Sequence, residues 1–313
     1  MDRLLSMRAF QQVVDDGSFA AAARTLDMSP AVMTRLITDL EQHLGARLMQ
    51  RTTRKQALTD AGQAYLSRVR NILSDLDEAE NTTRQHTAEL AGLLRIHTQP
   101  ILAVHVLAPV MAEFRRRYPK VELDVTVDDP DVSPIEDYDL TILGARSDYD
   151  ANVVARKVVE SEGLLCASPA FLRSAGTPLR PEHLQEFAFL RLNVPGTNPR
   201  DIKLFNPNES DQVLTAKIKP VLTVNHGDTL LRAALGGAGI CHQPTALVAP
   251  YLKEGLLQRV LAPWITGRFA VYVALPSRKF VPTRARVFME FLIEQSKHSA
   301  EISQRNLELD LRE

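Results

Sequence analysis

The first 58 residues place apolar and polar positions at helical spacing and predict three short helices followed by a hairpin. Ser18 is suited to the N-cap of the second helix, "SFAAAARTL", because its hydroxyl can accept from free backbone N–H groups. Ser29 and Pro30 favour the start of the third helix, and Gly45 favours its end. The polar centre of "ARLMQRTTRKQALT" predicts a turn between two short strands.

The third predicted helix has two unlike faces. Its apolar stripe, which we expect in the core, consists of Met33, Leu36, Ile37, Leu40 and Leu44. The opposite face consists of Ala31, Thr34, Arg35, Thr38 and Gln42. A helix exposed only to water usually mixes Glu with Lys, but the acidic residues here lie towards the edges of the polar face. Such a face suits DNA, since carboxylates would repel phosphates whereas hydroxyl, amide and guanidinium groups can bond to bases.

Residues 59 to 90 predict one long helix in which apolar positions follow a 3-4 repeat. The repeat runs through Leu58, Tyr65, Val69, Ile72, Leu76, Ala79, Thr83, His86 and Leu90. This spacing is typical of a coiled-coil seam, so we expect the helix to pair two chains. The residues expected to hold the dimer are Tyr65, Val69, Ile72, Leu76 and Ala79. The alternative is a helix that packs on its own domain.

From residue 92 onward strands alternate with helices, which predicts α/β layers with largely parallel sheets. The expected strands are "GLLRIHT", "VELDVTV", "DLTILGA", "GLLCAS", "ICHQP" and "FAVYVALP". The expected helices are "PILAVHVLAPVMAEFRRRYP", "DTLLRAALGGAG" and "RARVFMEFLIEQ". The charged end, "SKHSAEISQRNLELDLRE", predicts a tail that is helical or disordered, and "VPGTNPRDIKLFNPNES" contains too many turn formers to assign.

The composition is that of an ordinary globular protein, with 45% hydrophobic and 24% charged residues, and a length of 313 residues predicts two or three domains. Neither a run of 18 apolar residues nor an apolar signal segment is present, so we expect a cytoplasmic protein with no membrane partner. The two cysteines lie far apart in sequence, which fits thiols in a reducing compartment. The net charge is −1, yet four Lys and Arg gather between residues 47 and 55.

Two short helices joined by a tight turn, the second with a polar face, are typical of the helix-turn-helix motif, whose second helix lies in the major groove. The basic hairpin would then be a wing on the phosphates or the minor groove, and the helix begun by Ser18 could present N–H groups to a phosphate. The residues expected to contact DNA are Ser18, Ser29, Pro30, Ala31, Thr34, Arg35, Thr38, Arg51, Arg54 and Lys55. For any single one of them the alternative is a solvated surface side chain.

The stretch from "DGSFAAAARTL" through "SPAVMTRLI" and "LEQHLG" to "LTDAG" resembles the N-terminal signature of LysR-type transcriptional regulators. Met33, Thr34 and Met49 stand where that family usually has Val, Ser and Phe. The resemblance implies a winged helix-turn-helix, a dimerising linker helix and a two-lobed α/β effector domain similar to type 2 periplasmic solute-binding proteins. It also implies a homodimer or homotetramer on double-stranded promoter DNA, controlled by a small-molecule effector and working with RNA polymerase, with no cofactor and no metal.

We therefore expect an α+β multidomain chain. Its predicted parts are a winged helix-turn-helix DNA-binding domain over 1–58, a linker and dimerisation helix over 59–90, an effector-binding domain over 91–300 and a tail over 301–313. Within the effector-binding domain, lobe I is expected over about 91–161 and 268–300, and lobe II over about 162–267. A ligand between such lobes favours the carboxyl ends of strands and the N-termini of helices.

Two predicted helix starts, after "HTQ" and at "VNHGDT", could offer N–H groups to a carboxylate or phosphate, or could simply be capped. The family pattern adds the loop after the third strand and the end of the strand "ICHQP". The expected effector contacts are Thr98, Gln99, Pro100, Ile101, Gly144, Ala145, Arg146, Asn193, His226, Asp228, Thr229, Cys241 and His242. Arg146 could pair with an anionic effector or form a surface salt bridge. Cys241 could sense redox state, although a thiol in an apolar strand is more often inert core.

Three other classes of protein fit the sequence less well. An enzyme is disfavoured, because Cys241 and His242 point to opposite faces of a strand and "GGAGIC" is not the dinucleotide fingerprint. A solute-binding protein for transport would need an export signal. The alternative function is a DNA-binding regulator without a small-molecule effector, controlled by oligomerisation, pH or thiol redox state.

Overall fold

The computed structural model describes residues 2–51, 56–83, 90–129, 134–147, 154–194, 196–209, 213–276 and 281–310. The chain divides into two compact units, which we describe separately: the first is Met1–Leu90 with Arg278–Thr283, and the second is Ala91–Ser277 with Arg284–Glu313. In the described part of the chain, no helix combines the length and the apolar character needed to cross a membrane.

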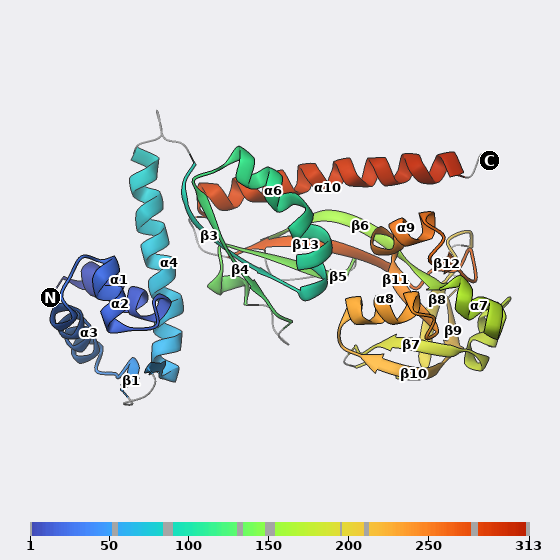
Figure 1. The fold of residues 1–313 in the computed structure, drawn as a ribbon, viewed down its shortest axis with the longest axis horizontal. Helices are drawn as coiled ribbons and strands as arrows, with labels where there is room; N and C mark the ends of the chain where they lie inside the picture. Colours follow the sequence, from blue (N-terminus) through green and yellow to red (C-terminus); the bar gives the residue numbers. More distant parts are fainter. Residues whose placement is uncertain are drawn as a thin grey trace. The chain divides into compact units, whose positions relative to one another are not determined.

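The first unit is a helix-turn-helix followed by a hairpin and a long helix (Figure 1). Its elements are α1 (Arg3–Asp15), α2 (Phe19–Thr25), α3 (Pro30–Leu44), β1 (Met49–Arg51), β2 (Gln56–Leu58) and α4 (Asp60–Thr83). The strands β1 and β2 pair antiparallel, so the predicted three helices and hairpin are confirmed. Phe10, Met33 and Leu40 are fully buried between the helices. Leu44, expected in the core, is 38% exposed, because α3 ends there and the chain turns away at Gly45 with a φ of 66°.

The long helix α4 packs on α1 along one side. Val69 is fully buried, and the half-buried ring of Tyr65 lies 5.9 Å from the ring of Phe10, centroid to centroid. Ile72, on the adjoining side, is 44% exposed. Val69 is therefore covered within a single chain, and its part in a seam between two chains stays a prediction. The helix ends at Thr83, and the rest of its predicted course, over 84–89, lies outside the described residues.

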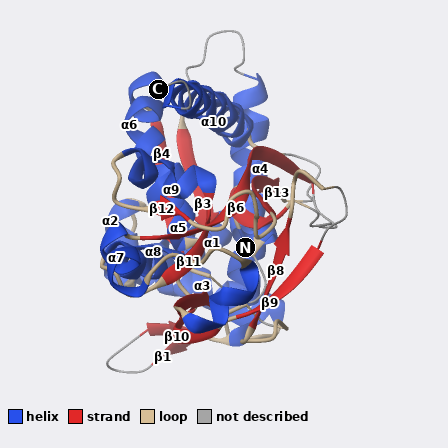
Figure 2. Cartoon of the chain, turned by 90° about the vertical axis from the view of Figure 1, so that its right-hand side faces the viewer, coloured by secondary structure: helices blue, strands red, loops and turns tan. Residues whose placement is uncertain are grey.

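Lobe I of the second unit is a sheet covered by helices. Its elements are β3 (Gly92–Thr98), α5 (Pro100–Leu102), the π-helical turn η1 (Ala103–Leu107), α6 (Ala108–Arg117), β4 (Val121–Val127), the 3-10 turn η2 (Ile135–Asp137), β5 (Leu140–Arg146), β13 (Arg268–Leu275) and α10 (Thr283–Asp310). The strand β3 runs parallel to β4 and β5, and β13 is antiparallel to β5. Helices α6 and α10 lie side by side (Figure 2), with the ring of Phe114 4.7 Å from that of Phe288. The backbone of the charged tail is helical as far as Asp310.

Lobe II contains a second set of parallel strands. Its elements are α7 (Pro169–Ala175), the 3-10 helix η3 (Pro181–Glu186), β7 (Ala188–Leu192), β8 (Asp201–Phe205), β9 (Val213–Lys217), β10 (Lys219–Val224), α8 (Gly227–Leu235), β11 (Ile240–Pro244), α9 (Thr245–Lys253) and β12 (Gln258–Arg259). The strands β10, β7 and β11 run parallel, so their carboxyl ends share one edge. The stretch that the sequence left unassigned contains β8, which pairs with β9 as a separate hairpin.

Two crossover segments join the lobes. The strand β6 (Val154–Ala167) pairs with β13 in lobe I and with β11 in lobe II, and the return segment passes through Thr266 and Gly267. The two segments meet at Gly163, whose N–H donates to the carbonyl of Gly267 and whose carbonyl accepts from the N–H of Thr266, both at 2.8 Å. A Cβ atom on Gly163 would lie 2.3 Å from Thr266 Oγ1. Glycine therefore allows the close approach of the two crossovers.

Candidate DNA interface and effector cleft

Capping fixes where the two helices of the helix-turn-helix begin. Ser18 Oγ accepts from the N–H of Ala21 at 3.1 Å, and Ser29 Oγ accepts from the N–H of Val32 at 3.3 Å. Pro30 occupies the first position of α3. Capping uses each hydroxyl oxygen as an acceptor, so the hydroxyl hydrogen can still be donated to a phosphate. Both caps form as the sequence predicts.

The two threonines on the polar face of α3 are hydrogen-bonded to the backbone of their own helix. Thr34 Oγ1 donates to the carbonyl of Pro30 at 2.9 Å, and Thr38 Oγ1 donates to the carbonyl of Thr34 at 2.8 Å. These bonds use the hydroxyl hydrogens, so the lone pairs and methyl groups are what the threonines can offer to a base. The face therefore combines these short, fixed side chains with the exposed residue Ala31.

Arg35 is the side chain of α3 with the longest reach on this face. Its side chain is 84% exposed, and its Nε lies 3.9 Å from a carboxylate oxygen of Asp39. An exposed pair of this kind contributes little to stability, so a phosphate or a guanine can replace Asp39 at small cost. Arg35 is thus placed to reach a base edge or the DNA backbone.

The buried carboxylate of Glu41 ties α3 to the hairpin, a role that the sequence analysis missed. Glu41 is 7% exposed, and its Oε1 accepts from the backbone N–H groups of Leu48 at 2.8 Å and Met49 at 3.1 Å. The guanidinium of Arg47 lies 3.9 Å from the other carboxylate oxygen. The signal for this role in "LEQHLG" was the position of Glu41, directly after the core residue Leu40 and one turn before the helix ends. A carboxylate buried there needs hydrogen-bond partners.

The remaining predicted DNA contacts belong to the hairpin. Arg51 ends β1, but nothing is described of its side chain, and Arg54 and Lys55 lie outside the described residues. Their contact with DNA stays a prediction. The same holds on α4 for Ala79, whose side chain is also not described, while Leu76 is half-buried.

In lobe I, Gln99 links two loops near the start of α5. Its Oε1 accepts from the N–H of Gly144, and its Nε2 donates to Asp129 Oδ1, both at 2.9 Å. Pro100 follows as the first residue of α5. Thr98 has no exposed surface in this conformation, and its contact with an effector stays a prediction. Its side chain lies on the inner face of β3.

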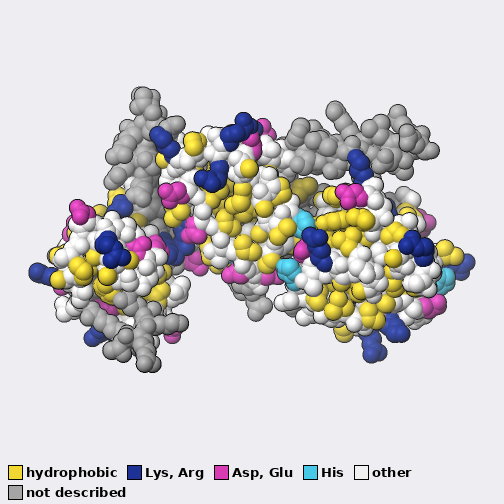
Figure 3. All heavy atoms as spheres, viewed as in Figure 1, with side chains coloured by type: hydrophobic (Ala, Val, Ile, Leu, Met, Phe, Trp, Pro, Cys, Tyr) yellow, Lys and Arg dark blue, Asp and Glu magenta, His cyan; other side chains and the backbone are white. Residues whose placement is uncertain are grey.

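The two lobes touch at the N-terminus of α8. His105 Nε2 lies 3.0 Å from Asp228 Oδ1, and a Cβ on Gly227 would lie 2.6 Å from Ile101 Cδ1. The hydrogen bond from His105 lowers the pKa of Asp228, and Arg232, 3.7 Å away, acts in the same direction. Figure 3 shows histidine side chains beside acidic and basic ones at this junction of the lobes.

The remaining predicted residues of α8 cap the helix. His226 Nδ1 accepts from the N–H of Thr229 at 3.3 Å and lies 2.8 Å from the Thr229 hydroxyl. The structure therefore brings His226, Asp228, Thr229 and Ile101 together at the lobe junction. These capping bonds are the structural role that the sequence offered as the alternative to ligand binding.

Arg146 reaches from lobe I towards lobe II at the crossovers. Its guanidinium lies 5.9 Å from the ring centroid of Phe205, and a Cβ on Gly267 would lie 3.2 Å from its Nη1. Ala145 is half-buried, and Asn193 is exposed at the end of β7. Arg146 is therefore part of the lobe junction, on a different element from the His105 and Asp228 contact.

Cys241 is fully buried in this conformation, and its contact with an effector stays a prediction. Its Sγ lies 3.7 Å from that of Cys166, its register partner on β6. The hydrogen bond with Cys166 and burial raise the pKa of the Cys241 thiol well above its usual range. The buried thiol form is therefore favoured over the reactive thiolate.

His242 follows on β11 with its side chain half-buried. Burial and the charge of Arg191 lower its pKa to about 4. Arg191, which the sequence analysis missed, is 7% exposed on the neighbouring strand β7. Within the residues that the structure describes, no group of three or more His, Cys, Asp or Glu side chains could hold a metal ion.

A capped helix-turn-helix with a hairpin, joined to a two-lobed domain, defines a DNA-binding transcriptional regulator with a ligand-binding domain. The model for the bacterial regulatory helix-turn-helix protein of the LysR family matches residues 4–63, and the model for the LysR substrate binding domain matches residues 87–297. The chain therefore belongs to the LysR family.

Its relatives are named as transcriptional regulators, and the similarity covers nearly the whole of both chains. An HTH-type transcriptional repressor of Pseudomonas aeruginosa is 32% identical, over 96% of this chain and 95% of the repressor. The HTH-type transcriptional regulator CrgA of Neisseria meningitidis is 32% identical, over 92% of this chain and 95% of its own length. The solved CrgA structure has a TM-score of 0.60 and covers 93% of this chain and 98% of that chain, with 30% identity. The full-length OxyR variant of Pseudomonas aeruginosa, at 14% identity and a TM-score of 0.65, shows the same fold.

Proposed function

We propose that this protein regulates transcription by binding promoter DNA through the exposed face of α3, under the control of a small molecule bound between the two lobes. The observation that best supports the DNA-binding part is the exposed Arg35 beside two threonines whose hydroxyls already donate to the helix. Ala31, Thr34, Arg35 and Thr38 read the major groove, and Ser18, Ser29 and Pro30 lie against the phosphates. The hairpin residues Arg51, Arg54 and Lys55 form the wing.

The contacts between the lobes support control by a small molecule. The lobes are joined by two crossover segments that meet at Gly163, and they touch through Ile101 and through His105 with Asp228. Contacts of this kind can open and close while the covalent connections hold. A ligand that binds one arrangement more tightly shifts the population towards it, which is how occupancy would reach the DNA-binding unit.

The other parts of the proposal follow from the chain's family. We propose that the exposed side of α4, including Ile72, pairs two chains, and that dimers or tetramers act on promoters together with RNA polymerase in the cytoplasm. The relatives are transcriptional regulators, and we assign no catalytic role to any residue.

The experiment is genome-wide mapping of the sites occupied by the protein in its own cells. We expect a small set of discrete promoter sites, and we expect Arg35→Ala to lose them while His43→Ala, exposed on the same helix but outside the polar face, retains most of them. Each site is then tested in vitro with molecules of the pathway encoded by the neighbouring genes. Uniform genomic occupancy would contradict the DNA-binding part, and unaltered promoter binding with every such molecule would contradict the effector part.

A second candidate is control by thiol oxidation, favoured by the 3.7 Å separation of Cys166 Sγ and Cys241 Sγ. In that case one hydroperoxide would oxidise the two thiols to a disulfide, and its two oxygens would leave as one alcohol and one water. Mass spectrometry of the peroxide-treated protein, with Cys241→Ser as the control, tests it. Two free thiols after treatment, with promoter binding unchanged, would exclude it.

A further inference from the structure

Arg191 and His242 lie side by side on lobe II, near the edge where the parallel strands end. The register of β7 and β11 pairs Leu190 with Cys241, so the next pair sets Arg191 beside His242. Leu190 and Cys241 pack under α8, and alternation along a strand puts Arg191 and His242 on the other face of the sheet. Ligands of open α/β sheets bind outside the carboxyl ends of the strands, which is where Arg191 stands, one residue before β7 ends.

The guanidinium of Arg191 is buried with neutral partners. Its Nη2 donates to Thr197 Oγ1 at 2.6 Å and lies 3.5 Å from the carbonyls of Thr197 and Asn198. Among the residues that the structure describes, no carboxylate pairs with Arg191, and the three contacts leave Nε and Nη1 to meet a ligand. A cation taken out of water normally requires an anion, because the desolvation penalty is otherwise uncompensated. Within the described part of the chain, the positive charge of Arg191 is thus not balanced by a carboxylate.

The lowered pKa of His242 is a second sign of the positive charge of Arg191. Burial and the positive charge of Arg191 both lower the pKa of His242, and no carboxylate of a described residue acts against them. The neutral imidazole keeps one N–H that can be donated to an anion. Two donors from adjacent strands, one of them permanently charged, are the means by which proteins bind carboxylates and phosphates.

A third polar group borders this face at the crossover. Thr266 is 6% exposed, and its Oγ1 is buried with no hydrogen-bond partner among the described residues. The Thr266 side chain lies over Gly163, which pairs with Pro244, two residues after His242 on β11. From lobe I, the Arg146 guanidinium lies against Gly267, the residue after Thr266. Arg191 and His242 therefore stand where the parallel strands end, and Thr266 and Arg146 stand at the crossover, which the pairing of Gly163 with Pro244 joins to β11.

We propose that the effector is a small organic anion whose oxyanion group binds Arg191 and His242 of lobe II, with Thr266 and Arg146 on the side of the crossovers. This inference rests on the proposed function, because it specifies the ligand of the same site. The anion supplies the charge that Arg191 lacks, and it links lobe II to the crossovers and to lobe I through Arg146. Carboxylate and phosphate share this chemistry.

The test uses the full-length protein and three probes: benzoate, succinate and inorganic phosphate, each compared with sodium chloride at equal ionic strength. A ligand selective for the folded state raises the melting temperature, and titration of that shift gives the dissociation constant. We expect at least one probe to raise the melting temperature above the chloride control. The carboxylates and phosphate act as separate arms, so the responding arm identifies which oxyanion the site takes.

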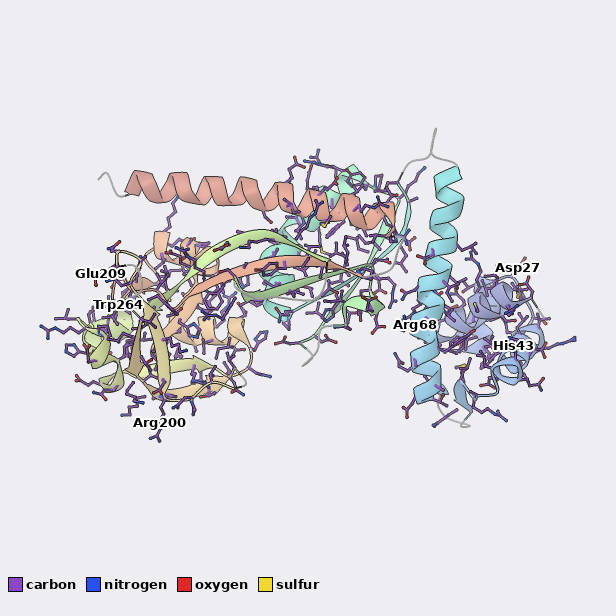
Figure 4. All side chains as sticks on the ribbon, turned by 180° about the vertical axis from the view of Figure 1, so that it is seen from behind. Asp27, His43, Arg68, Arg200, Glu209 and Trp264 are labelled. Atoms are coloured by element: carbon purple, nitrogen blue, oxygen red, sulfur yellow. The ribbon has the colours of Figure 1, made fainter. Side chains whose placement is uncertain are left out.

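Arg191→Met keeps an unbranched side chain without the charge and is expected to raise the dissociation constant of the responding probe at least tenfold. His242→Gln, which retains an N–H donor, is expected to raise it less than Arg191→Met does. The matched control is Arg200→Gln, since Figure 4 shows Arg200 extending away from the same lobe. We expect that control to stay within twofold of the parent protein.

The outcomes separate this inference from the proposed function. No response to any probe beyond chloride, or an unchanged constant in Arg191→Met, would overturn the anion site. If Arg191→Met does not fold, Arg191→Lys takes its place, because lysine keeps the charge but loses the fork of donors and should still weaken binding several-fold. If Arg191-dependent binding occurs and promoter binding never responds to the probe, the anion site stands and effector control fails. If promoter binding responds to a neutral molecule and not through Arg191, effector control stands and the anion site fails.

Discussion

Replacing Glu41 by alanine is expected to loosen the hairpin from α3. The substitution removes the carboxylate that accepts hydrogen bonds from both Leu48 N–H and Met49 N–H. Glu41 is only 7% exposed, so both N–H groups are left buried. A buried donor left without a partner costs about 1–3 kcal/mol, so two such donors cost about 2–6 kcal/mol. We take about 3 kcal/mol, within this range, as the expected value.

The assay is amide hydrogen exchange of the peptide that contains Leu48 and Met49. A loss of about 3 kcal/mol speeds exchange through local opening about a hundredfold, since 1.4 kcal/mol is a factor of ten. Glu41→Gln should cost less, about 1 kcal/mol, because its amide oxygen can still accept both bonds without the charge. Gln42→Ala, the exposed neighbour on α3, is the matched control and should leave the rates unchanged.

Arg47→Gln separates the hydrogen bonds from the ion pair with Glu41. The Arg47 side chain is 76% exposed and 3.9 Å from the carboxylate, so its loss should change exchange less than threefold. Exchange rates in Glu41→Ala within threefold of the parent would refute the reasoning. The hairpin would then be held by other contacts, and Glu41 would have no part in positioning it.

Three further predictions concern the pH dependence of stability, the crossover at Gly163 and the assembly of chains. The pKa of His242 is about 4 in the folded chain and 6.5 when exposed, so between these pH values the unfolded state binds a proton that the folded state does not. The free energy of unfolding of the second unit should therefore fall by up to about 3 kcal/mol as the pH drops from 6.5 to 4, and His242→Gln should reduce this dependence in urea unfolding. The same pH dependence in the variant would show that other groups cause it. Gly163→Ala should destabilise the protein by about 1–3 kcal/mol in thermal unfolding, because the new Cβ would lie 2.3 Å from Thr266 Oγ1. The control is Gly236→Ala, whose Cβ would meet nothing closer than 3.5 Å and should be tolerated. Equal effects of the two substitutions would contradict the close approach of the crossovers. Ile72→Glu, on an exposed position of α4, should shift the oligomer towards monomer in sedimentation analysis with little loss of folding, and an unchanged oligomer would remove this side of α4 from the interface.

The helix-turn-helix is the part of the fold that the sequence predicts best. Its boundaries depend on local chemistry, since Ser18 and Ser29 cap helices and Gly45 ends one in a left-handed conformation. Such signals act within a few residues and need no knowledge of the partner. Leu44 was misplaced because helical periodicity continues to the last turn, whereas the neighbouring helices stop covering the stripe before it.

Surfaces shared with distant residues were harder to predict. The repeat along α4 shows which positions are apolar but not what covers them, and α1 covers Val69 while Ile72 stays exposed. In lobe II, "FLRL" predicts a strand, yet only the register of β7 against β11 brings Arg191 beside His242. Thr98 and Cys241 are two of the effector contacts expected from the sequence, yet both side chains are fully buried, and a strand pattern does not show which of its two faces is covered.

Selection of binding sites from random DNA tests the central claim, that α3 reads promoter sequence through Arg35, most directly. The full-length protein and Arg35→Ala are selected in parallel at several salt concentrations. We predict one enriched motif for the parent protein, and for the variant a loss of about 1–3 kcal/mol in discrimination at one position, with salt-dependent binding to all DNA retained. The same motif with the same preference at every position in both proteins would contradict the account.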